Sequence, residues 1–147
     1  MKFFTLIFAL AFLSAFTKPS TKALTINSTG FDNNQGKGVL LVFRKSDPIP
    51  ESPFKTYHAA IKNYRSEFVI EDLPVGEYAI ILLHDANNNG KIDHSYGFPS
   101  EQLGYSNDWK LGFFTGLPTF EKLKFTRTEI STDLNINISY KKKNRKS

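Results

Sequence analysis

The sequence predicts an all-β fold, an antiparallel β-sandwich of six or seven short strands in a single domain over residues 23–140. Three observations predict it. Several short segments alternate apolar and polar residues with a period of two, which is the pattern of a half-buried strand. Clusters of Gly, Pro, Asn and Asp separate these segments, as turns do. No stretch of ten residues in this part of the chain has the apolar spacing of a helix.

Six segments are predicted as strands, and in chain order they are 23–28, 39–44, 66–73, 77–85, 122–127 and 133–140. The run 39–44 is apolar on both faces, as in a central strand. The segment 46–53 holds three prolines and is expected to be a loop or an irregular edge. The segment 54–61 fits either a short strand or a helical turn, and it would be the seventh strand.

Residues 86–120 lose this periodicity and are rich in glycine, asparagine and aromatic residues. A structureless stretch of this length in a compact domain is usually functional or unusually well packed. We therefore expect one long irregular loop region here, and most of the candidate functional residues lie in it.

The start of the chain has the layout of a secretory signal peptide. A lysine precedes an apolar run over residues 3–13, and the small residues Ser14 and Ala15 follow. The run is too short for a membrane-spanning helix, which needs about 20 apolar residues. We expect residues 1–22 to be a signal peptide with a short leader, cleaved near Ala15 or, as a later option, at Ala23. The protein is then exported, either to the periplasm or out of the cell.

The net charge of +5 arises from the two ends of the chain. Residues 1–22 and 141–147 hold eight of the 19 basic residues, so the body has 11 basic against 14 acidic residues and a net charge of −3. A nucleic-acid-binding protein carries its basic residues on the folded face, so no nucleic-acid partner is expected. The tail 141–147 is expected to be solvated and disordered, although such a tail can also touch anionic lipid or polysaccharide. The absence of cysteine excludes thiol chemistry and a lipoprotein anchor.

Several motifs occur in a fixed order between about residues 24 and 140. They are LPVGEY (73–78), the HD-x-N-x-NG-K-x-D loop (84–93), the G-F-P step with Glu101, GYSN (104–107) and PTFE (118–121). In this combination the chain closely resembles the domain of unknown function 2141 family, small exported proteins of Gram-negative bacteria. The resemblance implies an immunoglobulin-like or transthyretin-like sandwich and brings no activity with it. His94 and the stretch 108–116 depart from the family pattern.

The loop 85–93 has the residue spacing of a calcium-binding loop. Alternate oxygen-bearing side chains can point inward around one ion, and Gly90 permits the sharp turn between them. The position where such a loop places a bidentate glutamate is Tyr96, so Glu101 or Asp108 would have to complete the shell. The alternative is a long turn in which these side chains cap backbone amides. Ca²⁺ is the one cofactor indicated, and its candidate ligands are Asp85, Asn87, Asn89, Asp93 and the carbonyl of Lys91.

Aromatic residues crowd the same region, mixed with Gly, Ser and Asn. Aromatic faces beside amides are used in sugar and peptide recognition, and Trp109 is the best single candidate. The alternative is that these rings plug the open end of the sandwich. The candidate ligand-binding residues are Tyr96, Phe98, Glu101, Tyr105 and Trp109.

No motif for nucleophilic catalysis, phosphate binding or zinc proteolysis is present. The leading hypothesis is a non-enzymatic module that binds a cell-envelope glycan, peptide or protein partner through the 86–120 loops. The runner-up is a structural envelope protein with a calcium-stabilised 85–93 loop. A hydrolase built around His84 and Asp85 is the third hypothesis, and a transition-metal site of His84, His94 and Asp93 is a further alternative.

Overall fold

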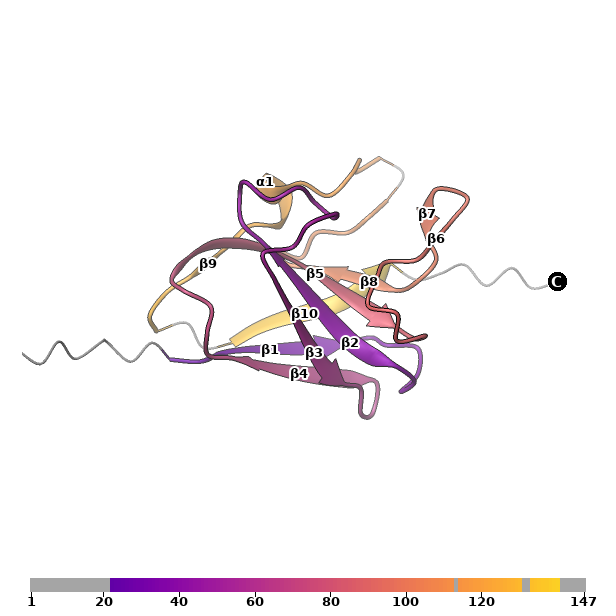
Figure 1. Cartoon of the computed structure of the whole chain (residues 1–147), viewed down its shortest axis with the longest axis horizontal. Coiled ribbons are helices and arrows are strands. Elements are labelled where there is room, and N and C mark those ends of the chain that lie inside the picture. The colour runs from indigo at the N-terminus through magenta and orange to yellow at the C-terminus, as the bar shows by residue number, and fades with distance from the viewer. Residues whose placement is uncertain (1–21, 113, 131–132, 141–147) are drawn as a thin grey trace, which may run out of the picture.

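The computed structural model describes residues 22–112, 114–130 and 133–140 of the 147-residue chain (Figure 1). Nearly all of the predicted leader and the whole tail 141–147 therefore lie outside the described residues. Within the described ranges, no helix has the length and the apolar character needed to cross a membrane. The elements are β1 (Leu24–Thr29), β2 (Lys37–Phe43), β3 (Lys55–Ala60), β4 (Arg65–Ile70), β5 (Gly76–Asp85), β6 (His94–Ser95), β7 (Phe98–Pro99), β8 (Leu103–Tyr105), α1 (Phe120–Leu123), β9 (Phe125–Arg127) and β10 (Asp133–Tyr140).

The prediction of an all-β fold is confirmed, and the strands form one strongly curled sheet. Its order is β3-β2-β5-β8-β10-β1-β4, with β9 added beside β5. The two end strands, β3 and β4, are consecutive in the chain and joined by a hairpin that a bridge between Lys62 and Arg65 closes. The sheet therefore forms a nearly closed, barrel-like shape (Figure 1). A sandwich consists of two packed sheets, whereas here one hydrogen-bonded path connects the seven strands from β3 to β4. The immunoglobulin-like sandwich therefore stays a prediction.

The expectation that every strand pair is antiparallel is wrong for β1 and β10, which run parallel. β10 also changes neighbours along its length, since its first residues pair with β1 and Ile138 and Tyr140 pair with β8 across an irregularity. Side-chain alternation shows which face of a strand is buried, but it carries no information on the direction of the neighbouring strand.

Three predicted boundaries also change. The ambiguous segment 54–61 contains a strand, β3, whereas the strand predicted at 122–127 is reduced to β9 and follows the single helical turn α1. The region 86–120 is not wholly irregular, because β8 lies in it and pairs with both β5 and β10. β8 is three residues long, which is too short to show a period of two in the sequence.

The central strands β2 and β5 are buried on both faces, as their continuous apolar runs predict. Leu40 and Leu82 point into the barrel interior, where they join residues of β1, β4 and β10. Val39 and Leu83 point to the opposite face and belong to a second cluster. That second cluster is completed by the long connection after β5, through residues that include Leu103, Tyr105, Phe120 and Leu123. The long connection therefore covers the outer face of the two central strands.

The described fold begins at Lys22, which is anchored to the segment around β9. Its N–H donates to the carbonyl of Glu129 at 3.2 Å, and its own carbonyl accepts a hydrogen bond from Arg127 Nη2 at 2.7 Å. Arg127 is completely buried and also donates through Nε to the carbonyl of Leu73.

Candidate functional site

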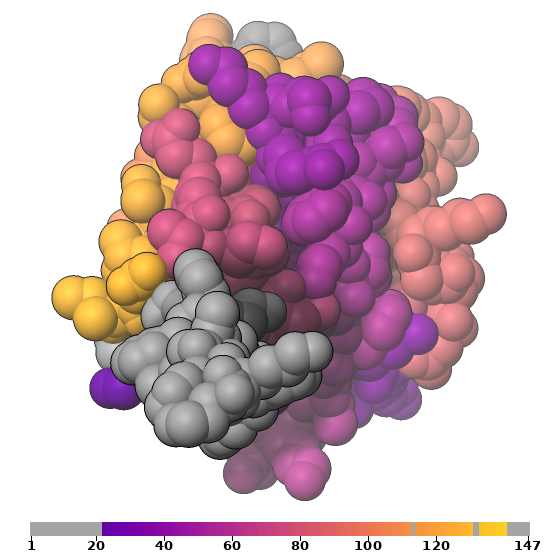
Figure 2. Space-filling view, turned by 60° about the vertical axis from the view of Figure 1, so that its left-hand side comes forward, coloured from indigo at the N-terminus to yellow at the C-terminus, as the bar shows by residue number. Residues whose placement is uncertain are grey.

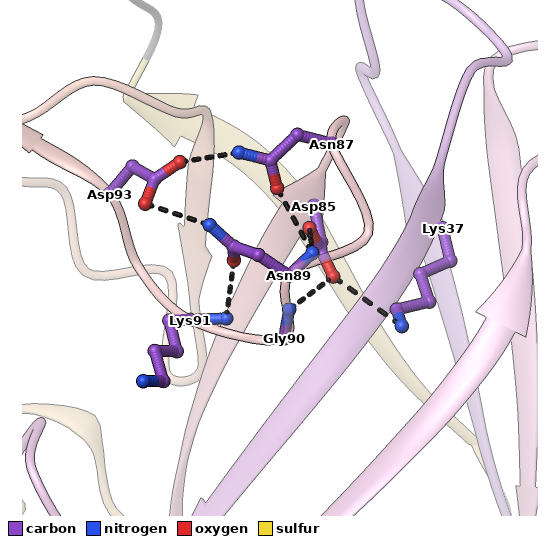
Figure 3. Close-up of polar contacts among 7 residues, drawn as sticks. All are labelled: Lys37, Asp85, Asn87, Asn89, Gly90, Lys91 and Asp93. Atoms are coloured by element: carbon purple, nitrogen blue, oxygen red, sulfur yellow. Dashed lines mark hydrogen bonds and ion pairs between the residues drawn. The ribbon is translucent and has the colours of Figure 1, made fainter.

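Asp85 is the last residue of β5, and its carboxylate is completely buried where β5 ends beside β2. Oδ1 accepts the N–H of Asn89 at 3.0 Å, and Oδ2 accepts the N–H of Gly90 at 2.9 Å (Figure 3). The ammonium group of Lys37 lies 3.5 Å from Oδ2. A buried carboxylate is costly unless it is paired and hydrogen-bonded. These three contacts meet that need, and they close residues 85–90 into a turn.

The rest of the loop is held by its asparagines. Asn87 Oδ1 accepts the N–H of Asn89 at 3.0 Å, and Asn89 Oδ1 accepts the N–H of Lys91 at 2.8 Å. Their amide nitrogens donate to the two carboxylate oxygens of Asp93, at 2.7 and 2.9 Å (Figure 3). Each asparagine thus makes the local turn contact that favours Asn in loops. The observed contacts are those of the backbone-capping alternative.

The spacing of the predicted calcium ligands does bring their side chains together, but the groups facing one another are not all oxygens. Asn87 and Asn89 present N–H groups to Asp93, so both amides would have to turn before their oxygens could bind a cation. In the described part of the chain, no three His, Asp or Glu side chains form a group placed to hold a metal ion. Lys91 contributes its N–H to the loop contacts.

Glu101 folds back onto this loop from the far side of β7. Its Oε2 accepts the N–H of Asp93 at 3.2 Å, and the N–H of Ser100 donates to the carbonyl of Asp93 at 2.8 Å. Burial raises the pKa of Glu101, and the negative charges of Asp93 and Asp85 raise it further, although N–H donation from Asp93 opposes them. Ser100 and Glu101 together tie the polar loop 85–93 to the end of β7.

Between these tied ends, β6 and β7 form a two-stranded ribbon with a two-residue turn. Ser95 pairs with Phe98, and the turn residues Tyr96 and Gly97 have φ angles of 52° and 80°. Two positive φ angles are the signature of a type I′ hairpin turn, which favours Asn-Gly. Tyr96 is 93% exposed and Phe98 is 65% exposed. The ribbon stands away from the barrel in Figure 1, and the connection after β5 that contains it forms the right-hand edge of the molecule in Figure 2.

Tyr105 and Trp109 lie elsewhere and are packed. Tyr105 on β8 is buried, which raises the pKa of its hydroxyl, and its ring meets that of Trp109 edge to face at 4.8 Å. The Lys122 ammonium lies 5.6 Å from the centre of the Trp109 ring.

A cavity of about 380 Å³ lies beside Trp109, lined also by Asp108, Lys110 and residues of β10. The five predicted ligand-binding residues therefore do not form one site.

His84 is buried at the end of β5, and protein groups occupy both of its ring nitrogens. Nδ1 lies 2.8 Å from Gln102 Oε1, and Nε2 lies 2.9 Å from the carbonyl of Gln35. The ring offers no nitrogen to a substrate in this arrangement, whereas His94 is exposed on β6. His84 instead joins the connection before β2 to the segment before β8.

Two residues that matter in this region have no signal in the sequence. Gln102 and Lys37 reach His84 and Asp85 from strands or loops that are far away in the chain. Gly36 has a positive φ of 70° and lies directly against the backbone of Asp85 and Ala86. The turn-forming run before β2 indicates a turn at Gly36, but the close approach to β5 depends on the strand pairing.

The comparisons with known proteins give one match. The model of the family described as "Uncharacterized protein conserved in bacteria (DUF2141)" matches residues 26–135, which confirms the resemblance seen in the motifs. No curated protein and no solved structure matches the chain.

Proposed function

Since this chain belongs to DUF2141, a bacterial family of uncharacterised proteins, we propose its function from its own geometry. The protein is a non-enzymatic, exported binding module, and the β6–β7 ribbon contacts a partner in the cell envelope through Tyr96 and Phe98. In this proposal the fold is an immunoglobulin-like sandwich, in which connections at one end commonly make the contacts.

The observation that carries the proposal is the position of Tyr96. A residue other than glycine, asparagine or aspartate is uncommon at positive φ, and holding it there costs of the order of 1–3 kcal/mol. The Tyr96 ring recovers little of this cost by packing, because 93% of the residue is exposed. Strained residues cluster at functional sites. Tyr96 differs from Tyr64, the other tyrosine at positive φ among the described residues, in being almost fully exposed and in lying two residues from a second exposed ring, that of Phe98. We attribute this combination to contact with a partner.

Replacing Tyr96 by asparagine is expected to separate folding from binding. The Tyr96→Asn variant creates the preferred Asn-Gly turn, so its melting temperature is expected to equal or exceed that of the parent. It removes the exposed ring, so retention of the protein on isolated cell-envelope fragments is expected to fall at least several-fold. Thermal unfolding followed by circular dichroism and co-sedimentation with the fragments measure the two effects.

A matched control is available at the β3–β4 hairpin. Tyr64 is also an exposed tyrosine at positive φ, with a φ angle of 62° and 56% exposure. The Tyr64→Ser variant is expected to be retained like the parent. Equal retention of the parent and Tyr96→Asn would rule out the ribbon as the contact element.

A second candidate function, calcium binding by the loop 85–93, is favoured by the position of Glu101. Its carboxylate lies close enough to Asp85 and Asp93 for their charges to raise its pKa. A cation would relieve this repulsion. Glu101 would then supply the carboxylate ligand that a calcium-binding loop places at the position of Tyr96. Calcium sites of extracellular modules bind Ca²⁺ with dissociation constants of roughly 10⁻⁴–10⁻³ M. In this proposal Ca²⁺ stiffens the base of the ribbon.

Calcium at about 100 times its dissociation constant is expected to stabilise the parent by about 2.7 kcal/mol, by mass action. The Glu101→Gln variant is expected to lose most of this effect. Without calcium, the raised pKa of Glu101 means that the folded state holds its proton more tightly than the unfolded state. Its contribution to stability is then full at acidic pH, is lost as the pH rises through the folded-state pKa, and is absent in Glu101→Gln. Melting curves with calcium and with chelator decide the matter, and superimposable curves would eliminate the site.

A further inference from the structure

We propose that the cavity beside Trp109 binds a neutral sugar, a small ring-shaped ligand rich in hydroxyl groups. The cavity has a volume of about 380 Å³ and is distinct from the β6–β7 ribbon, since neither Tyr96 nor Phe98 lines it. The domain thus has a second binding site, which does not depend on the contact that the ribbon makes.

Two hydroxyl groups of the lining have no hydrogen-bond partner among the described residues. Tyr105 lines the cavity and is only 3% exposed, and its hydroxyl forms no hydrogen bond with any residue that the structure describes. Ser139 lines the cavity too, and its buried Oγ is likewise unpaired in the described part of the chain. A buried tyrosine hydroxyl usually has a hydrogen-bond partner. Burial raises the pKa of Tyr105, so this hydroxyl stays protonated and can donate to an oxygen atom of a bound ligand.

The end of β8 fixes the position of Trp109 at the cavity. Ser106, the residue after β8, is completely buried, and its Oγ accepts the N–H of Ile80 at 2.9 Å and donates to the carbonyl of Leu123 at 2.5 Å. The N–H of Trp109 donates to the carbonyl of Ser106 at 3.4 Å, and the two residues between them have positive φ angles of 58° and 52°. This is a type I′ turn, and it brings Trp109 back against the ring of Tyr105. The cavity is therefore preformed, as ligand sites usually are.

The charges of the described lining residues balance. Asp108 and Lys110 lie on either side of Trp109 in the chain, both line the cavity, and neither forms an ion pair with a described residue. A phosphate-like ligand would favour an excess of cations, which the described part of this lining does not have. A carboxylate accepts hydrogen bonds, an ammonium group donates them, and the exposed amide of Asn137 does both. Sugar hydroxyls also donate and accept, so they can bind each of these groups.

The size of the cavity and its aromatic ring also favour a small sugar. Ligand pockets commonly have volumes of about 300–1,000 Å³, so a cavity of about 380 Å³ suits a small ligand. Trp109 is half-buried, so part of its ring surface remains at the cavity. An aromatic surface beside hydrogen-bonding groups suits a sugar, which has apolar C–H faces as well as hydroxyl groups. The larger cavity, of about 650 Å³, lacks this surface, because none of its described lining residues is aromatic.

Tryptophan fluorescence tests the proposal directly, because Trp109 is the single tryptophan of the chain. The probes are glucose and N-acetylglucosamine, each as the free sugar and as its β-1,4-linked tetrasaccharide. The emission of the parent is expected to change and to saturate with at least one of these probes. Saturation by a free sugar identifies a single ring as the ligand, whereas saturation by a tetrasaccharide alone identifies a unit of a glycan chain.

The Tyr105→Phe variant removes one hydroxyl and keeps the packing of the ring. It is expected to melt no lower than the parent, since no described residue satisfies that hydroxyl. It is expected to bind the saturating sugar roughly 3- to 10-fold more weakly, as for the loss of one hydrogen bond. Asn137→Ala is expected to weaken binding similarly. The matched control is Asn135→Ala, which changes an exposed asparagine of β10 outside this cavity and is expected to bind like the parent.

The absence of a saturable change with every probe overturns the proposal, as does a folded Tyr105→Phe variant that binds each probe like the parent. Tyr96→Asn is expected to bind the sugar like the parent. If Tyr96→Asn binds it as weakly as Tyr105→Phe is expected to, the sugar contacts the ribbon and the cavity is the wrong site. Retention of Tyr96→Asn on envelope fragments tests the ribbon separately, so either site can fail without the other.

Discussion

Replacing Gly36 by alanine is expected to destabilise the protein by about 3–5 kcal/mol, from overpacking and left-handed strain together. The new side-chain carbon would overlap the carbonyl oxygen of Asp85, and it would lie 2.7 Å from Ala86 Cα and 2.9 Å from the carbonyl carbon of Asp85. These are backbone atoms of the strand end, so they cannot move aside as a flexible side chain can. Urea unfolding followed by circular dichroism measures the loss.

Gly97 provides the matched control, because it has a similar φ of 80° but open space around it. The Gly97→Ala variant is expected to incur only the left-handed conformational cost, about 1 kcal/mol. The difference between the two alanine variants isolates the close approach of Gly36 to β5. A Gly36→Ala variant as stable as Gly97→Ala would show that the connection before β2 does not pack against Asp85 as described.

The second large effect is expected at Asp85. In Asp85→Asn, an amide replaces a carboxylate that accepts two backbone N–H groups and pairs with Lys37. At least one of these N–H groups then loses its acceptor, and the new amide nitrogen, at a completely buried position, faces donors and has no acceptor of its own. A buried polar group without a partner costs roughly 1–3 kcal/mol. We expect the free energy of unfolding to fall by about 2–4 kcal/mol, since the ion pair is lost as well. Urea unfolding of the purified variant measures this change.

Asp93→Asn serves as the comparison for Asp85→Asn. Asp93 accepts hydrogen bonds from two exposed asparagine amides. Water can replace those donors, so a loss below about 1 kcal/mol is expected. Comparable losses for the two substitutions would mean that the burial of Asp85 has no special role in the loop.

The strands that could be predicted from the sequence are those whose own residues report their burial. In β10, Ile136 and Ile138 are buried whereas Asn135 and Asn137 are exposed, and the alternation is visible without any partner. β2 and β5 reveal their central position because their apolar runs are continuous. The parallel pairing of β1 with β10 could not be predicted in this way, since it depends on how distant segments meet.

In the candidate site, too, the features that depend on local sequence could be predicted and those that depend on long-range pairing could not. Asp85, Asn87, Asn89 and Asp93 meet because their spacing along one turn brings them together, so the sequence could predict the cluster. It could not predict which of the aromatic residues would be exposed. Tyr105 is buried because β8 pairs with β5 and β10, whereas Tyr96 sits on a turn with open space around it. The sequence indicates both Glu101 and Asp108 as residues that could complete a calcium shell, and only the fold brings Glu101 to the N–H of Asp93.

The buried Asp85 carboxylate closes the polar loop 85–93 and thereby fixes the ribbon that bears Tyr96. Hydrogen–deuterium exchange of Asp85→Asn, compared with the parent, tests it most directly. Amide exchange is predicted to accelerate across residues 87–101, which depend on the loop, while β1, β4 and β10 keep their protection. Unchanged protection of residues 87–101 in a folded Asp85→Asn variant would contradict the claim.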